Sequence, residues 1–466
     1  MPARRVARLS IGTSTTRRGF LGTAGRAAAA TSVVALAGSE PAVHAAGSDE
    51  IRIALIGCGG RGGGAAADAL SVPGANIKLV AMADLFLDSI SSRRRSLGEQ
   101  FKERVDVPEE RCFVGINAYK SAIDSLMPGD IAICATPVGF RAAHFAYAIE
   151  KGVHALLEKP ISIDGISTKR MIELAAEADA KKLKVGVGLM CRHSEARRQL
   201  FDRLQNGEAG DLIAFHGYRE HGPLQPMDLH PGPPEGMSEL FWQAKRFHGF
   251  LWASGGVFSD FYVHHVDEVC WMKNAWPVKV EAIGGRHFHG TLDDQNFDSY
   301  GVEYTFADGT KFFYSGRTMR DCEQKFGVFG QGTKGAFTIS VSGHSPAKST
   351  IYKGQEMAKE NILWTAEQPE KSPYRLEWEH LVAAIKSGER YNEVVRGAEA
   401  SLVTAMGRFA AHTGRSVTYE EMLNSPDDLT AGVAELTDDS PAPLQRGAEG
   451  VYPVPMPGRF KYEFRS

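Results

Sequence analysis

The chain of 466 residues has few cysteines for its length, and it has no long apolar run after its N-terminal region. Its six cysteines are spread singly, without the C-x-x-C spacing that structural zinc sites favour. A cysteine density this low excludes a small scaffold held together by disulfides. No run outside the N-terminal segment approaches the roughly 18 apolar residues of a membrane-spanning helix, so we expect no stable membrane anchor.

An excess of charge of one sign is also missing. Lys and Arg number 53 against 56 Asp and Glu, and 43% of the residues are hydrophobic. This profile excludes a largely disordered or collagen-like chain. Because residues 1–46 hold six arginines, no lysine and a single acid, the rest of the chain is mildly acidic. That balance argues against nucleic acid, or an anionic membrane surface, as the main partner.

The basic N-terminal segment has the parts of an export signal. Arg17-Arg18 stands before Gly-Phe-Leu, an apolar stretch covers 27–37, and small residues at 42–45 suit a cleavage site. This arrangement resembles a twin-arginine signal, so we expect residues 1–46 to be a signal peptide and the mature protein to be periplasmic. A frayed basic terminus is the alternative interpretation.

From Ile51 onward, short apolar runs alternate with helical patterns. The runs that predict strands are at 51–56, 78–83, 131–135, 153–157 and 184–189, and the patterns that predict helices include 85–104, 141–151 and 164–183. Alternation of this kind predicts βαβ units and a parallel sheet covered on both faces.

After about residue 190 the pattern changes. Five prolines within 222–236 predict a loop. Strands are predicted at 277–287, 299–306, 310–316 and 325–329, with a hairpin turn at 307–309, and amphipathic helices at 373–388 and 393–413. We therefore expect an α/β protein with a Rossmann domain over 47–190, an α+β domain over 191–426 with a large, mainly antiparallel sheet, and a C-terminal tail over 427–466.

A G-x-G-x-x-G pattern follows the first predicted strand and precedes a helix. Glycines there permit a tight turn and let backbone amides approach a pyrophosphate at the helix N-terminus. Asp84 closes the next strand roughly 20 residues later, the spacing of a carboxylate that binds the adenine ribose. Such an acid repels a 2′-phosphate, so NAD is favoured over NADP, and we interpret Arg93-Arg94-Arg95 as a solvated helix face. The cofactor-binding candidates in this region are Gly57, Gly59, Gly60, Arg61, Gly62 and Asp84.

Two segments carry candidate catalytic residues. Lys159 lies in a Glu-Lys-Pro turn at the carboxyl end of another strand of the same sheet, the end at which such sheets bind ligands. Asp260 and His264 stand four residues apart, on one face of a predicted helix, with Asp267 three further on. A carboxylate, an imidazole and an ammonium can together move a proton at a substrate hydroxyl. We expect His264 to take that proton, Lys159 to orient and polarise the oxygen, and Asp260 to orient His264.

Two other interpretations of that helix remain open. Asp260 could cap a helix while His264 is an ordinary buried histidine. Alternatively, Asp260, His264 and Asp267 could bind a metal; no further ligand is apparent at a recognisable spacing, so we expect no metal site.

Taken together, the Gly loop, Thr136-Pro137, Glu158-Lys159-Pro160 and the G-G-x-x-x-D-x-x-x-H stretch at 255–264 resemble the glucose–fructose oxidoreductase/inositol dehydrogenase (Gfo/Idh/MocA) family, in particular its twin-arginine-exported members. The resemblance covers about 51–423. It implies a nicotinamide cofactor and sugar or cyclitol substrates. It also implies that 191–426 is the substrate and oligomerisation domain, whose open sheet often forms dimers or tetramers. It also implies that Lys159, Asp260 and His264 are catalytic, and that Thr136, Pro137, Glu158 and Lys159 line the cofactor.

The sequence therefore predicts an NAD(P)-dependent oxidoreductase that acts on a CH–OH group of a sugar or cyclitol. The alternatives are a redox-assisted glycosidase with retained NAD, hydride transfer between two sugars, and a non-catalytic protein that binds a dinucleotide or a sugar. The intact lysine, aspartate and histidine set favours an enzyme. Four further residues are candidates for contacts with substrate, namely Arg192, His193, Tyr262 and His265.

Overall fold

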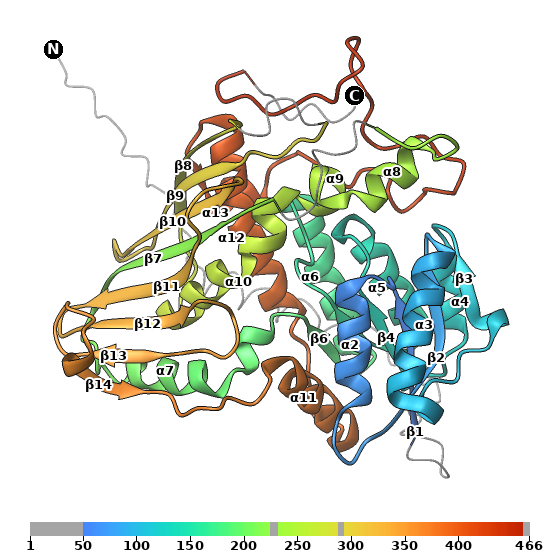
Figure 1. The fold of residues 1–466 in the computed structure, drawn as a ribbon, viewed down its shortest axis with the longest axis horizontal. Coiled ribbons are helices and arrows are strands. Elements are labelled where there is room, and N and C mark those ends of the chain that lie inside the picture. The colour runs from blue at the N-terminus through green and yellow to red at the C-terminus, as the bar shows by residue number, and fades with distance from the viewer. Residues whose placement is uncertain (1–49, 224–231, 288–292, 460–466) are drawn as a thin grey trace, which may run out of the picture. The chain divides into compact units, whose positions relative to one another are not determined.

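The computed structural model describes residues 50–223, 232–287 and 293–459 (Figure 1). The predicted signal peptide and most of the Pro-rich 222–236 segment lie outside these ranges. Within them, no helix combines the length and the apolar character needed to cross a membrane.

The first part of the described chain forms a six-stranded parallel sheet in the order β3-β2-β1-β4-β5-β6. Its strands are β1 (Glu50–Ile56), β2 (Asn76–Asp84), β3 (Cys112–Val114), β4 (Ile131–Cys134), β5 (His154–Leu157) and β6 (Val185–Val187). The helices between them are α2 (Gly60–Leu70), α3 (Leu87–Phe101), α4 (Ala118–Asp124), α5 (Arg141–Glu150) and α6 (Gly165–Ala180). The predicted Rossmann fold is confirmed.

Alternating side chains of β1 bury the two faces of this sheet. Ile53 and Leu55 pack in one core with α2 and α3, whereas Ala54 and Ile56 pack in another with α4, α5 and α6. Successive side chains of a strand point to opposite faces, so a strand covered on both faces becomes a continuous apolar run. The first core also includes α11 (Pro373–Ser387), a helix from the C-terminal half of the sequence.

The second sheet has nine strands in the order β14-β13-β12-β11-β7-β10-β9-β8-β15. Its members are β7 (Leu212–His221), β8 (Lys279–Gly285), β9 (Ser299–Thr305), β10 (Lys311–Thr318), β11 (Lys325–Gly332), β12 (Ala336–Val341), β13 (Thr350–Tyr352), β14 (Ile362–Thr365) and β15 (Val417–Thr418). All its strand pairs are antiparallel except β7 with β10, which confirms the expected sheet. The sequence pattern predicted four of these strands, β8 to β11. It missed β7, which lies inside the sheet, and β12 to β15.

One face of the second sheet packs against α10 (Gly256–Lys273) and α12 (Val394–Thr413). The remaining helices are α7 (Glu195–Gln205), α8 (Glu239–Lys245), α9 (Leu251–Ser254) and α13 (Tyr419–Leu423). Gly255 and Gly256 join α9 to α10 with φ angles of 72° and 77°. A Cβ on Gly255 would lie 2.8 Å from the Cβ of Ser259, so both conformation and space require glycine at this turn.

Residues 427–459 form no helix or strand, yet they are packed. Leu436, Leu444 and Tyr452 share a core with Phe140 and Trp252. This segment was expected only as a tail punctuated by proline and glycine; its buried apolar side chains attach it to the rest of the fold.

Candidate active site

The loop between β1 and α2 has the geometry of a pyrophosphate cradle. Gly57 has a φ of 95°, and a Cβ on Gly62 would lie 1.9 Å from the carbonyl oxygen of Gly57. By contrast, a Cβ on Gly59 or Gly60 would meet no atom within 4 Å. Two glycines are thus required by the fold, and the other two leave open the approach to the N-terminus of α2, where amides and the helix dipole favour a phosphate. These residues fit a dinucleotide.

Asp84 lies at the carboxyl end of β2, beside this loop. Its carboxylate accepts hydrogen bonds from the amides of Cys58 (2.7 Å) and Phe86 (3.0 Å). Burial raises the pKa of Asp84. Arg93 Nε lies 3.4 Å from the carbonyl oxygen of Cys58. Arg93 therefore contacts the cofactor loop, which corrects its interpretation as part of a solvated face.

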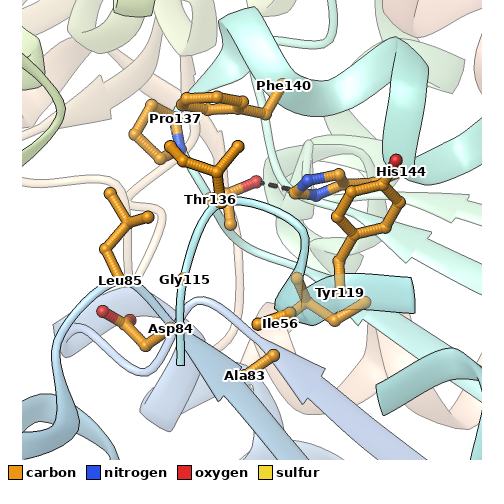
Figure 2. A pocket seen from close by; sticks show the side chains of 12 residues that line it. Ile56, Ala83, Asp84, Leu85, Gly115, Tyr119, Thr136, Pro137, Phe140 and His144 are labelled. Carbon is orange, nitrogen blue, oxygen red and sulfur yellow. Dashed lines mark hydrogen bonds between the residues drawn. The ribbon is translucent and has the colours of Figure 1, made fainter. Parts of the chain in front are cut away.

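An apolar pocket lies beyond the carboxyl ends of β1, β2 and β4 (Figure 2). Leu85, Ile116, Pro137 and Phe140 contribute apolar walls, and Asp84 lies at its edge. Thr136 Oγ1 and His144 Nδ1 are 3.2 Å apart on one side of it. In a Rossmann sheet with this strand order the adenosine half of a dinucleotide lies over the β2 side, so this pocket suits the adenine.

A larger crevice continues from this pocket toward the second sheet. The residues that line it from the Rossmann side include Gly59, Arg61, Thr136, Pro137, Glu158 and Lys159, and those from the opposite side include Arg219, His248, Asp260, Phe261, His264 and His344. Arg61 Nε pairs with the Glu158 carboxylate at 2.9 Å, and the Arg61 guanidinium lies over the ring of Tyr374. The predicted residues of the Gly loop and of the Glu-Lys-Pro turn thus meet in one crevice.

Lys159 and Asp260 join the two sides of the crevice. Lys159 Nζ donates to the backbone oxygen of Asp260 at 2.6 Å, and it lies 3.3 Å from the Asp260 carboxylate. The second carboxylate oxygen lies 3.0 Å from Nδ1 of His248. Burial alone would raise the pKa of Asp260, but Lys159 and His248 hold this pKa well below its ordinary value. Asp260 is therefore a carboxylate at neutral pH.

His264 lies one turn further along α10, and it is neutral. Burial, followed by the nearby His344 and Lys159, holds its pKa well below 6.5. Among the described residues, its Nδ1 has no hydrogen-bond partner, and its ring centroid lies 4.6 Å from that of His344. We expected Asp260 to orient His264; instead the Asp260 carboxylate faces Lys159 and His248, because those two side chains approach the same helix face.

The four residues expected to contact substrate lie elsewhere. Arg192 forms a bidentate ion pair with Asp267, at 2.8 and 2.7 Å. The Nδ1 atoms of His193 and His380 lie 2.8 Å apart. Asp267 is thus occupied by an arginine, so the alternative metal site with Asp260 and His264 does not form.

Tyr262 and His265 point away from the crevice. Tyr262 is fully buried among the aromatic rings of the second sheet, and His265 Nδ1 lies 3.2 Å from the hydroxyl of Tyr314. A helix turns by about 100° per residue, so these two positions face the sheet while Asp260 and His264 face the crevice.

Arg219, His248, Phe261 and His344 are among the crevice residues that no sequence motif predicted. Arg219 lies on β7, and His344 lies between β12 and β13. Neither position belongs to a recognisable motif, and only the pairing of strands brings them to α10.

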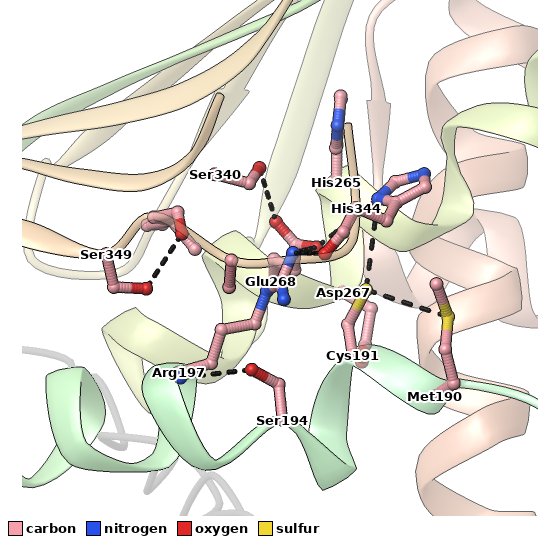
Figure 3. Close-up of polar contacts among 12 residues, drawn as sticks. Met190, Cys191, Ser194, Arg197, His265, Asp267, Glu268, Ser340, His344 and Ser349 are labelled. Carbon is pink, nitrogen blue, oxygen red and sulfur yellow. Dashed lines mark hydrogen bonds and ion pairs between the residues drawn. The ribbon is translucent and has the colours of Figure 1, made fainter. Parts of the chain in front are cut away.

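Among the described residues, Cys191, Glu268 and His344 offer ligand atoms within 4.8 Å of one another (Figure 3). However, Arg197 pairs with Glu268 at 3.0 Å, and both side chains are fully buried. Because the Arg197 guanidinium already neutralises the Glu268 carboxylate, we do not interpret these three residues as a metal site. Instead, Glu268 and Arg197 form a buried ion pair that positions His344.

The comparisons agree with this geometry. Residues 51–188 match the profile of the Gfo/Idh/MocA family, described as an oxidoreductase family with an NAD-binding Rossmann fold. An inositol 2-dehydrogenase of Corynebacterium glutamicum is 28% identical over 152 residues, which is 33% of this chain and 37% of that protein. The matched segment thus spans little more than a third of the curated relative.

Two solved structures share the fold over a longer range. An aldose–aldose oxidoreductase from Caulobacter crescentus, complexed with glycerol, has a TM-score of 0.61 at 16% identity, over 79% of this chain and 99% of its own. An oxidoreductase from Agrobacterium radiobacter, in complex with NAD+, L-tartaric acid and magnesium, has a TM-score of 0.57 at 14% identity, over 80% and 99%. Residues 51–188 therefore form an NAD-binding Rossmann domain that is similar to that of the Gfo/Idh/MocA oxidoreductase family.

Proposed function

We propose that the protein is an NAD-dependent oxidoreductase that acts on a CH–OH group of a sugar or cyclitol. One observation carries the proposal: Lys159, Asp260 and His264 line a single crevice with the Gly loop. The inositol dehydrogenase relative and the aldose–aldose oxidoreductase neighbour support this class of substrate.

Bound NAD would supply the acceptor for a hydride from the substrate carbon. His264 is neutral and lines the crevice, so it can take the proton of the hydroxyl on that carbon. Lys159 would orient the same oxygen and stabilise its negative charge. Asp260 would position Lys159, because its backbone oxygen and its carboxylate both contact the Lys159 ammonium. This role replaces the orientation of His264 that we first expected of Asp260.

A second candidate is hydride transfer between two sugars with NAD retained throughout. The C-terminal segment favours it, because the Asp438 carboxylate accepts the amide of Ile116 at 2.7 Å and Asn117 Nδ2 donates to the carbonyl of Leu436 at 3.1 Å. Ile116 lines the pocket suited to adenine, so these contacts would slow the loss of a bound dinucleotide.

The purified protein tests both candidates. Mass spectrometry of the denatured protein would identify a retained dinucleotide, and absorbance at 340 nm would follow the reaction with sugars and cyclitols. A dehydrogenase forms reduced cofactor in proportion to substrate consumed. A sugar–sugar transferase or a redox-assisted glycosidase turns over without net change at 340 nm, and only the glycosidase releases an aglycone. If sugars bind and none reacts, the proposal is wrong and the protein is a binding protein.

We also propose export to the periplasm and assembly into a dimer or tetramer. Export rests on the twin-arginine pattern at Arg17-Arg18. Assembly is supported by the face of the second sheet away from α10, which exposes Ile213, Ile283 and Leu363 by 53%, 79% and 60%.

A further inference from the structure

We propose that the natural substrate is an anionic sugar or polyol whose carboxylate binds to Arg219. This inference rests on the proposed function, and it narrows the class of substrate to sugar acids. The observations that carry it are the position of Arg219, the pairing of the other cations in the crevice, and the cluster that holds Arg219 in place.

Arg219 is half-buried and fixed on one side only. Its Nη1 donates to the carbonyl oxygen of Phe261 at 2.9 Å and to Nε2 of His344 at 2.9 Å. The guanidinium carbon lies 5.1 Å from the ring centroid of Phe261 and 5.6 Å from that of Phe326. Both hydrogens of Nη1 are thus used, while Nη2 and Nε have no protein partner within the described residues. These two nitrogens form the edge that binds a carboxylate with two parallel hydrogen bonds.

The other cations of the crevice already have partners. Arg61 pairs with Glu158, and Lys159 with Asp260. Arg141 is fully buried and donates to the carbonyl oxygens of Cys134 and Thr136. Among the described residues, no carboxylate pairs with Arg219. A guanidinium held in a half-buried crevice without a counter-charge favours an anionic ligand over a neutral one.

Arg219 is kept in this orientation by His344. Figure 3 shows the buried residues that surround His344. Because His344 Nε2 accepts from Arg219, Nδ1 carries the proton, and it lies 3.6 Å from Glu268 Oε1. Glu268 is held in turn by Arg197 at 3.0 Å and by the hydroxyl of Ser340 at 3.2 Å. Burial lowers the pKa of His344 to about 4, so His344 stays neutral and can accept at physiological pH. The cluster is therefore a support for one guanidinium.

The position of Arg219 indicates where the anion lies on the substrate. His344 contacts Arg219 through Nε2, and its ring centroid lies 4.6 Å from that of His264. Arg219 and His264 therefore flank the same imidazole, and a carboxylate on Arg219 would lie within about one sugar ring of the hydroxyl that His264 serves. Arg219 belongs to β7 of the second sheet, and not to the Rossmann sheet whose Gly loop would hold the phosphates of NAD.

The test uses the full-length protein and compares sugar acids with the corresponding neutral sugars as substrates. We would measure kcat/KM at 340 nm, and binding by calorimetry with NAD present, for glucuronate, galacturonate and gluconate against glucose, galactose and myo-inositol. Glucose 6-phosphate tests whether the anion is a phosphate instead of a carboxylate. We expect the wild-type protein to prefer a carboxylate sugar and to lose this preference at high salt.

Variants then assign the preference to Arg219. Arg219→Gln should lower kcat/KM for the carboxylate sugar by roughly 10²–10³-fold and leave NAD affinity unchanged. Arg219→Lys keeps the positive charge but cannot form two parallel hydrogen bonds, so its kcat/KM for the carboxylate sugar should lie between those of the wild-type protein and Arg219→Gln. Arg203→Gln removes a half-buried arginine of α7 that pairs with Glu208 and does not line the crevice, so it should leave both kcat/KM and the preference for the acid unchanged.

Three results would overturn the inference. In the first, the protein binds neutral sugars and turns them over with the same kcat/KM as their acids. In the second, Arg219→Gln lowers kcat/KM equally for acids and neutral sugars. In the third, the protein prefers only the phosphate ester. Failure of the proposed function has a different signature, because the acid would then bind in an Arg219-dependent way without any oxidation or transfer.

Discussion

The ammonium of Lys159 lies 2.6 Å from the backbone oxygen of Asp260 and 3.3 Å from its carboxylate. Lys159 comes from the end of the Rossmann sheet and Asp260 from α10, so this contact joins the cofactor side of the crevice to its substrate side. It also keeps a buried carboxylate ionised.

This pair predicts a strong kinetic coupling. Lys159→Ala and Asp260→Asn should each lower kcat by roughly 10²–10⁴-fold, because Asp260 holds the ammonium that Lys159 brings to the substrate oxygen. The double variant should lose far less than the product of the two single losses, because each residue acts through the other. Steady-state kinetics with the best substrate, beside titration of NAD as a control, would measure this. Independent, multiplicative losses would contradict the pairing.

The neutral state of His264 predicts the pH profile. A base works in its deprotonated form, and the pKa of His264 lies well below 6.5. Lowering the pH from 8 to 6.5 should therefore not protonate His264, and the acid limb of log kcat/KM should appear only below pH 6.5. His264→Ala should lower kcat by roughly 10²–10⁴-fold and remove that limb. An acid limb at or above pH 6.5, or full activity in the alanine variant, would count against His264 as the base.

Two glycines of the cofactor loop should respond differently to alanine. Gly62→Ala places a Cβ 1.9 Å from a backbone oxygen, so we expect a loss of about 1–3 kcal/mol in unfolding free energy together with loss of NAD binding. Gly60→Ala meets no atom within 4 Å, so the fold should be kept while the new methyl group hinders the phosphates. Denaturant midpoints and NAD titrations separate the two effects. Equal destabilisation by both substitutions would contradict this account of the loop.

Asp84 and Arg93 should set the choice between NAD and NADP. Asp84→Ala removes two hydrogen bonds to the loop and the charge that repels a 2′-phosphate, so NAD affinity should fall roughly 10–100-fold and discrimination should relax. Arg93, which contacts the same loop, should then attract NADP. Adding Arg93→Ala should cancel that gain. An unchanged ratio of the NAD and NADP affinities would show that Asp84 does not bind the adenine ribose.

The export proposal predicts a simple phenotype. Arg17→Lys together with Arg18→Lys should leave the protein in the cytoplasm with residues 1–46 or so uncleaved. Fractionation and N-terminal mass spectrometry would measure this. Normal appearance of the double variant in the periplasm would count against a twin-arginine signal.

The sequence predicted the Rossmann half well because its signals are local. The Gly loop, Asp84 and the Glu-Lys-Pro turn each follow an apolar strand directly, and continuous apolar runs are what a sheet covered on both faces requires. The strand β3 was missed because it has only three residues. In the second sheet β7 was missed, and its sequence, which mixes His, Tyr, Arg and Glu, resembles no apolar strand.

The substrate side depended on contacts between distant segments. Periodicity placed Asp260 and His264 on one helix face, and that placement is what the structure shows. It could not show that the Asp260 carboxylate faces Lys159, since the two residues are 101 positions apart. Tyr262 and His265 were misplaced because the orientation of a nearly all-buried helix is set by what packs around it.

The sequence by itself thus determined the Rossmann fold and the dinucleotide loop, and it pointed to Lys159, Asp260 and His264 as the catalytic candidates. Only the tertiary structure decided which side chains surround them, namely Arg219, His248, Phe261 and His344. The physical reason is the range of the forces involved. A turn, a helix face or a glycine at positive φ is fixed by neighbours in the chain, whereas the charge and shape of a crevice depend on strand pairings between residues far apart in sequence.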